Sequence, residues 1–169
     1  MLMALTEKSM RLMLYSEHMK ETIFDKIISK QIPSFIVWED DKHLAFLTPF
    51  PNTPGFTVVI PKTNPGDYIF AIDSPVYNDL LLATKTVANL LEKALDVSRV
   101  ALVFEGTGVA HVHAKLIPLH GSFADQTGVW SDHTTFSETY LGYLTTAEGP
   151  RMDDAQLAAI QAQILNANQ

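Results

Sequence analysis

The sequence contains no cysteine among its 169 residues, so it can form neither a disulfide nor a thiolate metal site. It also lacks an excess of positive charge, because 19 acidic and 12 basic residues give a formal net charge of −7. Nucleic-acid-binding proteins usually carry a basic surface, so this class is not expected. Any phosphate-bearing ligand must be held by local hydrogen-bond donors rather than by the overall field of the protein.

Long hydrophobic runs are absent from the sequence as well. Glu7, Lys8 and Arg11 interrupt the apolar N-terminus, which is not typical of a signal peptide, and no later stretch approaches the length of a membrane span. We therefore expect a soluble, cytoplasmic protein. With 47% hydrophobic residues, the chain is long enough for one domain with a substantial core, and it shows no internal repeat.

The middle of the chain alternates between strand-like and helical patterns. Alternating apolar residues bounded by turn residues predict strands at 35–39, 43–47, 56–61 and 99–104. Apolar residues at helical spacing predict helices at 6–20, at 22–29, after an N-cap at Ser74 with Pro75 at the first helical position, and from about Asp153. Several strands with short turns and one main helix indicate an α+β fold with an antiparallel sheet.

The stretch from Glu105 to Pro118 carries polar residues at alternate positions. A glycine pair, β-branched residues and a final proline predict a β-strand there. Side chains two apart on a strand share a face, so His111, His113 and Lys115 line up roughly 7 Å apart on one outer face. The opposite, apolar face holds Ala110, Val112, Ala114 and Leu116. On spacing alone, such a polar row is more often a solvated surface than a functional site.

Short motifs on both sides of this row resemble one protein family. In chain order they are Ile23-Phe24-x-Lys26-Ile27-Ile28, Glu39-Asp40-Asp41, Ala45-Phe46-Leu47, Pro54-Gly55, Val59-Ile60-Pro61-Lys62 and His111-x-His113. Their order and spacing over residues 22–118 resemble the histidine triad (HIT) family. The resemblance implies one HIT-like domain over residues 1–169, with a five-stranded antiparallel sheet and one main helix. Its core would cover about 22–120, with N- and C-terminal extensions at 1–21 and 121–169 that add helices.

The family is known for hydrolysis or nucleotidyl transfer at the α-phosphate, and the chain resembles its diadenosine polyphosphate hydrolases. By position, His113 matches the nucleophile that forms a nucleotidyl intermediate, and His111 matches the histidine that orders the site behind it. The positions that wall the family's base pocket are Ile23, Phe24, Ile27 and Phe46. The resemblance implies a nucleotide or dinucleoside polyphosphate as partner, a homodimer, no cofactor or catalytic metal, and neither a nucleic acid polymer nor a membrane.

The motif departs from the family at its third histidine, which is Lys115 here. A histidine there contacts the phosphate and assists the leaving group by donating a proton. Lysine supplies a permanent cation and three donors for a phosphate, but it is a poor proton donor near neutral pH. The variant His-x-His-x-Lys motif therefore leaves hydrolysis, transfer and binding alone as separate possibilities.

Three other positions also differ from the family. Thr48 replaces the acidic residue that grips the ribose, and the loop before the triad is the shorter Phe104–Gly108. Its Gly106 and Gly108 still allow backbone N–H groups to approach a phosphate, so Gly108 is a candidate nucleotide contact. The positions that hold a structural zinc in some members are occupied by Thr22, Asp25 and Phe56, so that zinc is not expected.

Three functions follow from these observations. The first is a nucleotide hydrolase or nucleotidyl transferase that uses His113, with His111 and Lys115 in support. The second is a nucleotide-binding module that has lost turnover with its third histidine. The third is a metal-dependent hydrolase that uses His111, His113 and one of His120 or His133. It is disfavoured because Lys115 stands between the candidate ligands and would repel a cation.

Overall fold

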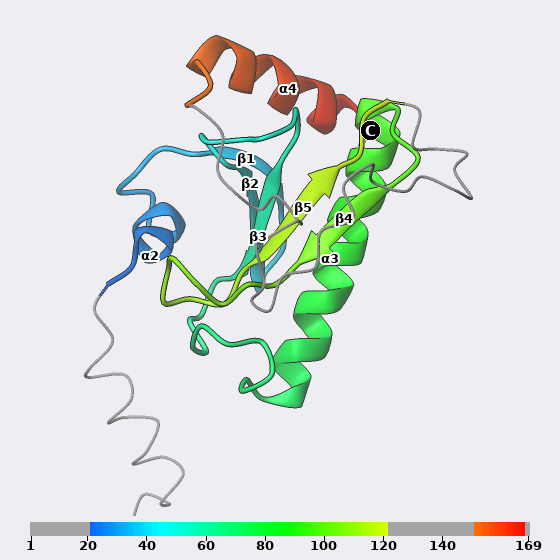
Figure 1. Cartoon of the computed structure of the whole chain (residues 1–169). Helices are drawn as coiled ribbons and strands as arrows, with labels where there is room; N and C mark the ends of the chain where they lie inside the picture. The colour runs from blue at the N-terminus through cyan, green and yellow to red at the C-terminus, as the bar shows by residue number, and fades with distance from the viewer. Residues whose placement is uncertain (1–20, 122–150, 168–169) are drawn as a thin grey trace, which may run out of the picture.

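A computed structural model describes residues 21–121 and 151–167 (Figure 1). The described residues form one antiparallel sheet whose strands lie in the order β1-β2-β3-β5-β4. The strands are β1 (Phe35–Glu39), β2 (His43–Leu47), β3 (Thr57–Pro61), β4 (Val100–Val103) and β5 (Ala114–Pro118). The helices are α2 (Ile23–Ile28), α3 (Ser74–Leu95) and α4 (Asp154–Asn166). The predicted α+β fold with a five-stranded antiparallel sheet is confirmed, whereas the helix predicted at 6–20 lies outside the described residues.

The central strands β2 and β3 are buried on both faces. Alternate residues of a strand point to opposite faces, and the two resulting sets pack into separate apolar clusters. Ala45, Leu47 and Val59 join the α3 cluster, together with α3 residues such as Leu80 and Leu91. The residues that face α2 are Leu44, Phe46, Val58 and Ile60, which pack with Phe24 and Ile27. The sheet therefore separates a main core under α3 from a smaller apolar layer under α2.

Helix α3 runs along one face of the sheet, and α4 lies beside it against β1 (Figure 1). The backbone of Asp73 is extended and forms the N-cap of α3, so the predicted cap at Ser74 is one residue late. The helix predicted from about Asp153 is confirmed: Asp153 is the N-cap of α4, and its carboxylate accepts the Gln156 N–H at 3.0 Å. None of the described helices is long and apolar enough to cross a membrane.

Strand β5 begins later than the sequence pattern predicts. His111 and His113 precede it, and the His111 N–H bonds to the Val109 carbonyl at 2.8 Å instead of joining a ladder. The neighbouring strand ends at Pro61, which has no N–H to donate, so the ladder cannot continue in that direction. Val112 and Ala114 lie in the main core as expected, but both histidines are buried rather than on an outer, solvated face.

Candidate active site

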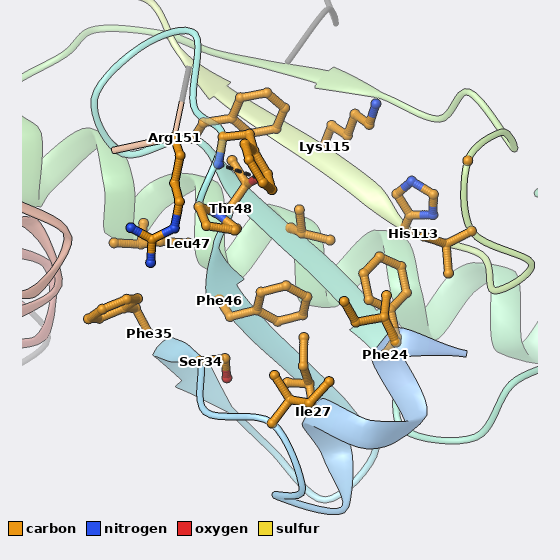
Figure 2. A pocket seen from close by; sticks show the side chains of 18 of the residues that line it. Phe24, Ile27, Ser34, Phe35, Phe46, Leu47, Thr48, His113, Lys115 and Arg151 are labelled. Carbon is orange, nitrogen blue, oxygen red and sulfur yellow. Dashed lines mark hydrogen bonds between the residues drawn. The ribbon is translucent and has the colours of Figure 1, made fainter. Parts of the chain in front are cut away.

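A cavity of about 650 Å³ lies on the α2 side of the sheet (Figure 2). Phe46 and Val58 contribute to it from β2 and β3, α2 forms one wall, and the loop before β5 forms another. All five residues predicted to contact a nucleotide line this cavity: Ile23, Phe24, Ile27, Phe46 and Gly108. His113 and Lys115 line it as well, whereas His111 lies behind it, with its side chain completely buried.

The apolar part of the cavity is built on Phe24. Helix α2 presents this residue through a capping box, in which Thr22 and Asp25 satisfy each other's backbone N–H groups. The Phe24 ring meets Phe46 edge-on at a centroid distance of 5.7 Å, and it meets the His113 ring at 5.2 Å. Such a wall suits a flat, largely apolar group lying directly beside His113.

The hydrogen bond of His113 fixes which of its nitrogens carries the proton. Nδ1 lies 2.8 Å from the main-chain carbonyl oxygen of His111, and a carbonyl can only accept. Nδ1 is therefore the protonated nitrogen, and Nε2 of the neutral ring keeps its lone pair. Burial lowers the pKa of His113 below 6.5, and the nearby Lys115 charge lowers it further, against the opposing effects of the His111 carbonyl and Glu105. His113 is thus a neutral imidazole at neutral pH, and its ring lies at a largely apolar cavity.

A hydrogen bond of the His111 ring fixes this residue behind His113. Its Nε2–H donates to the carbonyl oxygen of Pro61 at 2.8 Å, and its Nδ1 has no hydrogen-bond partner among the described residues. Nδ1 lies 3.8 Å from a carboxylate oxygen of Asp25, too far for a hydrogen bond. Burial lowers the pKa of the His111 imidazole, so this ring is neutral at neutral pH. The hydrogen bond to Pro61 fixes the residue, and its main-chain carbonyl oxygen accepts the Nδ1–H of His113.

Lys115 forms an ion pair with Glu105 at the edge of the cavity. The register of the sheet explains this contact, because Lys115 lies opposite Val103 on β4 and Glu105 follows Val103 by two residues. The Lys115 side chain is 14% exposed and that of Glu105 is 28% exposed, so the pair is only partly accessible to water. A permanent cation and a carboxylate therefore stand together beside the neutral imidazole of His113.

The glycines before β5 adopt backbone conformations that other residues rarely take. Gly106 and Gly108 have φ angles of 68° and 85°. A Cβ on Gly106 would lie 3.3 Å from the Asp67 carbonyl oxygen, whereas none of the described residues has an atom within 4 Å of a Cβ on Gly108. Gly108 therefore lines the cavity with open space around the position that a Cβ would take.

Arg151 and Asp154 line the far end of the cavity and were not predicted from the sequence. The Arg151 guanidinium donates to the Asp154 carboxylate at 2.7 Å, next to the start of α4. Figure 2 shows Arg151 beside Thr48 and Leu47, across the cavity from His113. Thr48 is buried, and its hydroxyl oxygen accepts the Phe50 N–H at 3.2 Å, so this position offers a hydroxyl and no carboxylate.

The other described histidines lie away from this cavity. His43 is buried at the start of β2, where its ring lies 3.1 Å from the Asp40 carboxylate. The His120 ring lies 2.9 Å from the Pro54 carbonyl oxygen, and this residue does not line the cavity. His133 falls outside the described residues.

The positions that carry zinc in some HIT proteins do not offer a zinc site here. The Asp25 carboxylate accepts hydrogen bonds from the Thr22 N–H and hydroxyl, both at 2.7 Å, and Phe56 has no donor atom. Asp25 and His111 alone supply too few ligands for a tetrahedral zinc ion. Within residues 21–121 and 151–167, no three His, Asp or Glu side chains are grouped to hold a metal ion.

Comparison with known proteins identifies the family. The HIT domain model matches residues 29–122, more than half of the chain. The chain is 37% identical over 105 residues to the 14 kDa zinc-binding protein of Brassica juncea, covering 57% of this chain and 91% of that one. It is 58% identical over 45 residues to the adenylylsulfatase HINT1 of Arabidopsis thaliana, covering 27% of this chain and 31% of that one. A crystal structure of a HIT-like protein from Bartonella henselae matches with a TM-score of 0.65 at 24% identity, covering 87% and 96% of the two chains. The chain belongs to the HIT domain family, which includes hydrolases.

Proposed function

We propose that this protein is a nucleotide hydrolase or nucleotidyl transferase that acts at the α-phosphate through a nucleotidyl intermediate on His113. The observation that carries the proposal is the hydrogen bond from His113 Nδ1 to the His111 carbonyl, which leaves the Nε2 lone pair available at the cavity. Adenylyl sulfate, which the name of the Arabidopsis relative indicates as its substrate, and dinucleoside polyphosphates are the first candidate substrates.

Each candidate site residue takes a defined role in this proposal. The base lies against Phe24, Ile27 and Phe46, with Ile23 at the rim of the same apolar wall. The α-phosphate then lies between His113 and the backbone of Gly108, within reach of the Lys115 ammonium. His111 makes no contact with the ligand and acts by holding its carbonyl under the ring of His113.

The proposed reaction has two steps. Nε2 of His113 attacks the α-phosphorus, and the bond from phosphorus to the leaving group breaks with its electrons on the leaving group. The imidazole becomes cationic as it does so, and its Nδ1–H bond to a carbonyl oxygen stabilises that charge. Water then attacks the same phosphorus in hydrolysis, or a second acceptor attacks it in transfer, and His113 is released.

A binding module without turnover is the second candidate. It is favoured by the ion pair of Lys115 with Glu105, since a lysine in an ion pair does not supply the proton that a histidine supplies at this position. It predicts nucleotide binding in the same cavity with no product and no adduct.

The deciding experiment is mass spectrometry of the intact protein after incubation with adenylyl sulfate or a diadenosine polyphosphate. We expect the mass of one adenylyl group on the protein and none on His113→Ala. His120→Ala is the matched control, because that ring bonds to Pro54 outside the cavity. Product formation by His113→Ala at the rate of the unchanged protein would overturn the proposal. Binding measured by calorimetry without product or adduct would establish the binding module instead.

We further propose that two copies of the chain associate through α3 and the edge strand β4. Leu102 on β4 is 44% exposed, so this edge strand presents an apolar side chain for a second copy to pack on. A monomer in light scattering at micromolar concentration would contradict this assembly.

A further inference from the structure

Among the described residues, two permanent cations line the cavity, and the proposed α-phosphate needs only one of them. Lys115 lies on the His113 side, whereas Arg151 lies across the cavity from His113, beside Thr48 (Figure 2). We propose that Arg151 and Thr48 bind a second phosphate, carried by the 2′ or 3′ oxygen of the ribose. The preferred ligands would then be nucleotides that are phosphorylated on their ribose. This inference rests on the proposed function, because it extends the ligand placed in that site.

The stereochemistry of a nucleotide directs its ribose oxygens toward Arg151. In the proposed function the base lies against Phe24 and Phe46, and the 5′-phosphate lies at His113. The base and the 5′ carbon project from one face of the ribose ring, and the 2′ and 3′ oxygens project from the opposite face. These oxygens therefore point away from His113, toward the end of the cavity that Thr48 and Arg151 line.

The Arg151 guanidinium has donors for a phosphate in addition to its present contacts. Nη2 donates to the Asp154 carboxylate at 2.7 Å, and Nη1 donates to the Met152 carbonyl at 3.3 Å. These bonds use two of the five N–H donors of a guanidinium. The Arg151 side chain is 57% exposed, so a ligand phosphate can reach this group while the bond to Asp154 stays in place. The planar guanidinium also matches the geometry of phosphate oxygens better than a lysine does.

Thr48 supplies a second donor beside the guanidinium. Its hydroxyl oxygen accepts the Phe50 N–H at 3.2 Å, and a hydroxyl that accepts one hydrogen bond can still donate its own hydrogen. A phosphate at neutral pH offers chiefly acceptor oxygens, whereas free ribose hydroxyls also donate and are held well by a carboxylate. A guanidinium together with a hydroxyl therefore favours a ribose phosphate over free ribose hydroxyls.

Asp154 makes the inference sharper, because its charge should oppose that of Arg151. Its carboxylate also lines the far end of the cavity, where it would repel a second phosphate. Removal of the Arg151 charge should therefore lower the preference for a ribose phosphate, and removal of the Asp154 charge should raise it. If this end held free ribose hydroxyls, Asp154 would accept their hydrogen bonds, and its removal would only weaken nucleotide binding.

Arg151→Gln and Asp154→Asn test these two effects. Both substitutions keep polar side chains of similar size and remove one charge each. The matched control is Arg99→Gln, which removes the same charge from an exposed arginine that does not line the cavity. Thermal unfolding of the three variants verifies that each one folds.

Calorimetry measures the preference as a ratio of dissociation constants. The ligands are adenosine monophosphate, adenosine 2′,5′-bisphosphate and adenosine 3′,5′-bisphosphate. We expect the unchanged protein to bind one bisphosphate about tenfold or more tightly than the monophosphate, and the tighter one identifies the ribose oxygen. This ratio should fall close to one in Arg151→Gln and rise in Asp154→Asn. It should stay at its original value in Arg99→Gln.

Equal affinity of the unchanged protein for all three nucleotides would overturn the ribose-phosphate site, and so would the same ratio in Arg151→Gln. Weaker binding of the monophosphate by Asp154→Asn, without a rise in the ratio, would assign this end of the cavity to free hydroxyls instead. These measurements need no turnover, so they are independent of the search for an adduct on His113. Absence of that adduct with the ratio preserved would overturn the proposed reaction and support the ribose-phosphate site.

Discussion

The ring of His113 and the main chain of His111 are joined by a hydrogen bond of 2.8 Å from Nδ1 to the carbonyl oxygen. This bond assigns a proton to one nitrogen and a lone pair to the other, using an acceptor that does not titrate. Since the acceptor is part of the backbone, it depends on the placement of His111, whose own ring is fixed on Pro61. The reactivity proposed for one histidine therefore depends on the packing of the other.

Burial of both imidazoles predicts that the protein loses stability on mild acidification. The folded pKa values of His111 and His113 lie below the usual 6.5, so above pH 6.5 both the folded and unfolded chains are neutral at these rings. As the pH falls through 6.5, the unfolded chain takes up protons first, and the free energy of unfolding decreases. Urea unfolding between about pH 8 and pH 5 measures the slope of the free energy of unfolding against pH. His113→Asn should make it shallower, and an identical slope in that variant would contradict the prediction.

The lysine at position 115 predicts selectivity for the leaving group. Sulfate and phosphate leave as stable anions, whereas the amine of a phosphoramidate must gain a proton as it leaves. We expect the unchanged protein to prefer adenylyl sulfate over an adenosine phosphoramidate in kcat/KM. Lys115→His should narrow this preference about tenfold or more, because it introduces a proton donor near neutral pH. If the ratio of kcat/KM for the two substrates is the same in both proteins, the residue at position 115 does not protonate the leaving group.

Much of the fold could be predicted from local pattern, because local residues determine it. The hairpin of β1 and β2 follows from alternating apolar residues around a polar turn, and α3 follows from an apolar stripe at helical spacing. The HIT motifs also located the cavity walls, since all five nucleotide-contact candidates line one cavity.

Features that depend on contacts between distant segments could not be predicted in this way. The burial of His111 depends on α2 and on Pro61, which is 50 residues earlier in the chain. The pairing of Glu105 with Lys115 depends on the register of β4 against β5. Arg151 reaches the cavity only because α4 packs against β1 and α3, and no motif marks this residue in the sequence.

Phe24 should contribute to stability and to ligand binding together. Its ring is buried and lies edge-on to Phe46, to His113 and to His111, the last at 5.8 Å. Phe24→Leu keeps an apolar group but removes these ring contacts, so we expect a loss of about 1 kcal/mol in the free energy of unfolding. We also expect severalfold weaker binding of adenosine monophosphate in calorimetry. Phe70→Leu is the control, since that ring is 75% exposed and lies outside the cavity.

Gly108 should be needed for adduct formation on His113 as well as for the stability of the loop. Its φ of 85° strains any residue with a Cβ, so Gly108→Ala should cost about 1–2 kcal/mol of stability. Gly66 has a φ of 114° and equally open space around a Cβ, but it does not line the cavity, which makes Gly66→Ala the matched control. Urea unfolding should show similar losses in both variants. If the Gly108 backbone approaches the phosphate, only Gly108→Ala should also slow adduct formation on His113. Equal adduct rates in the two variants would remove this loop from the proposed phosphate site.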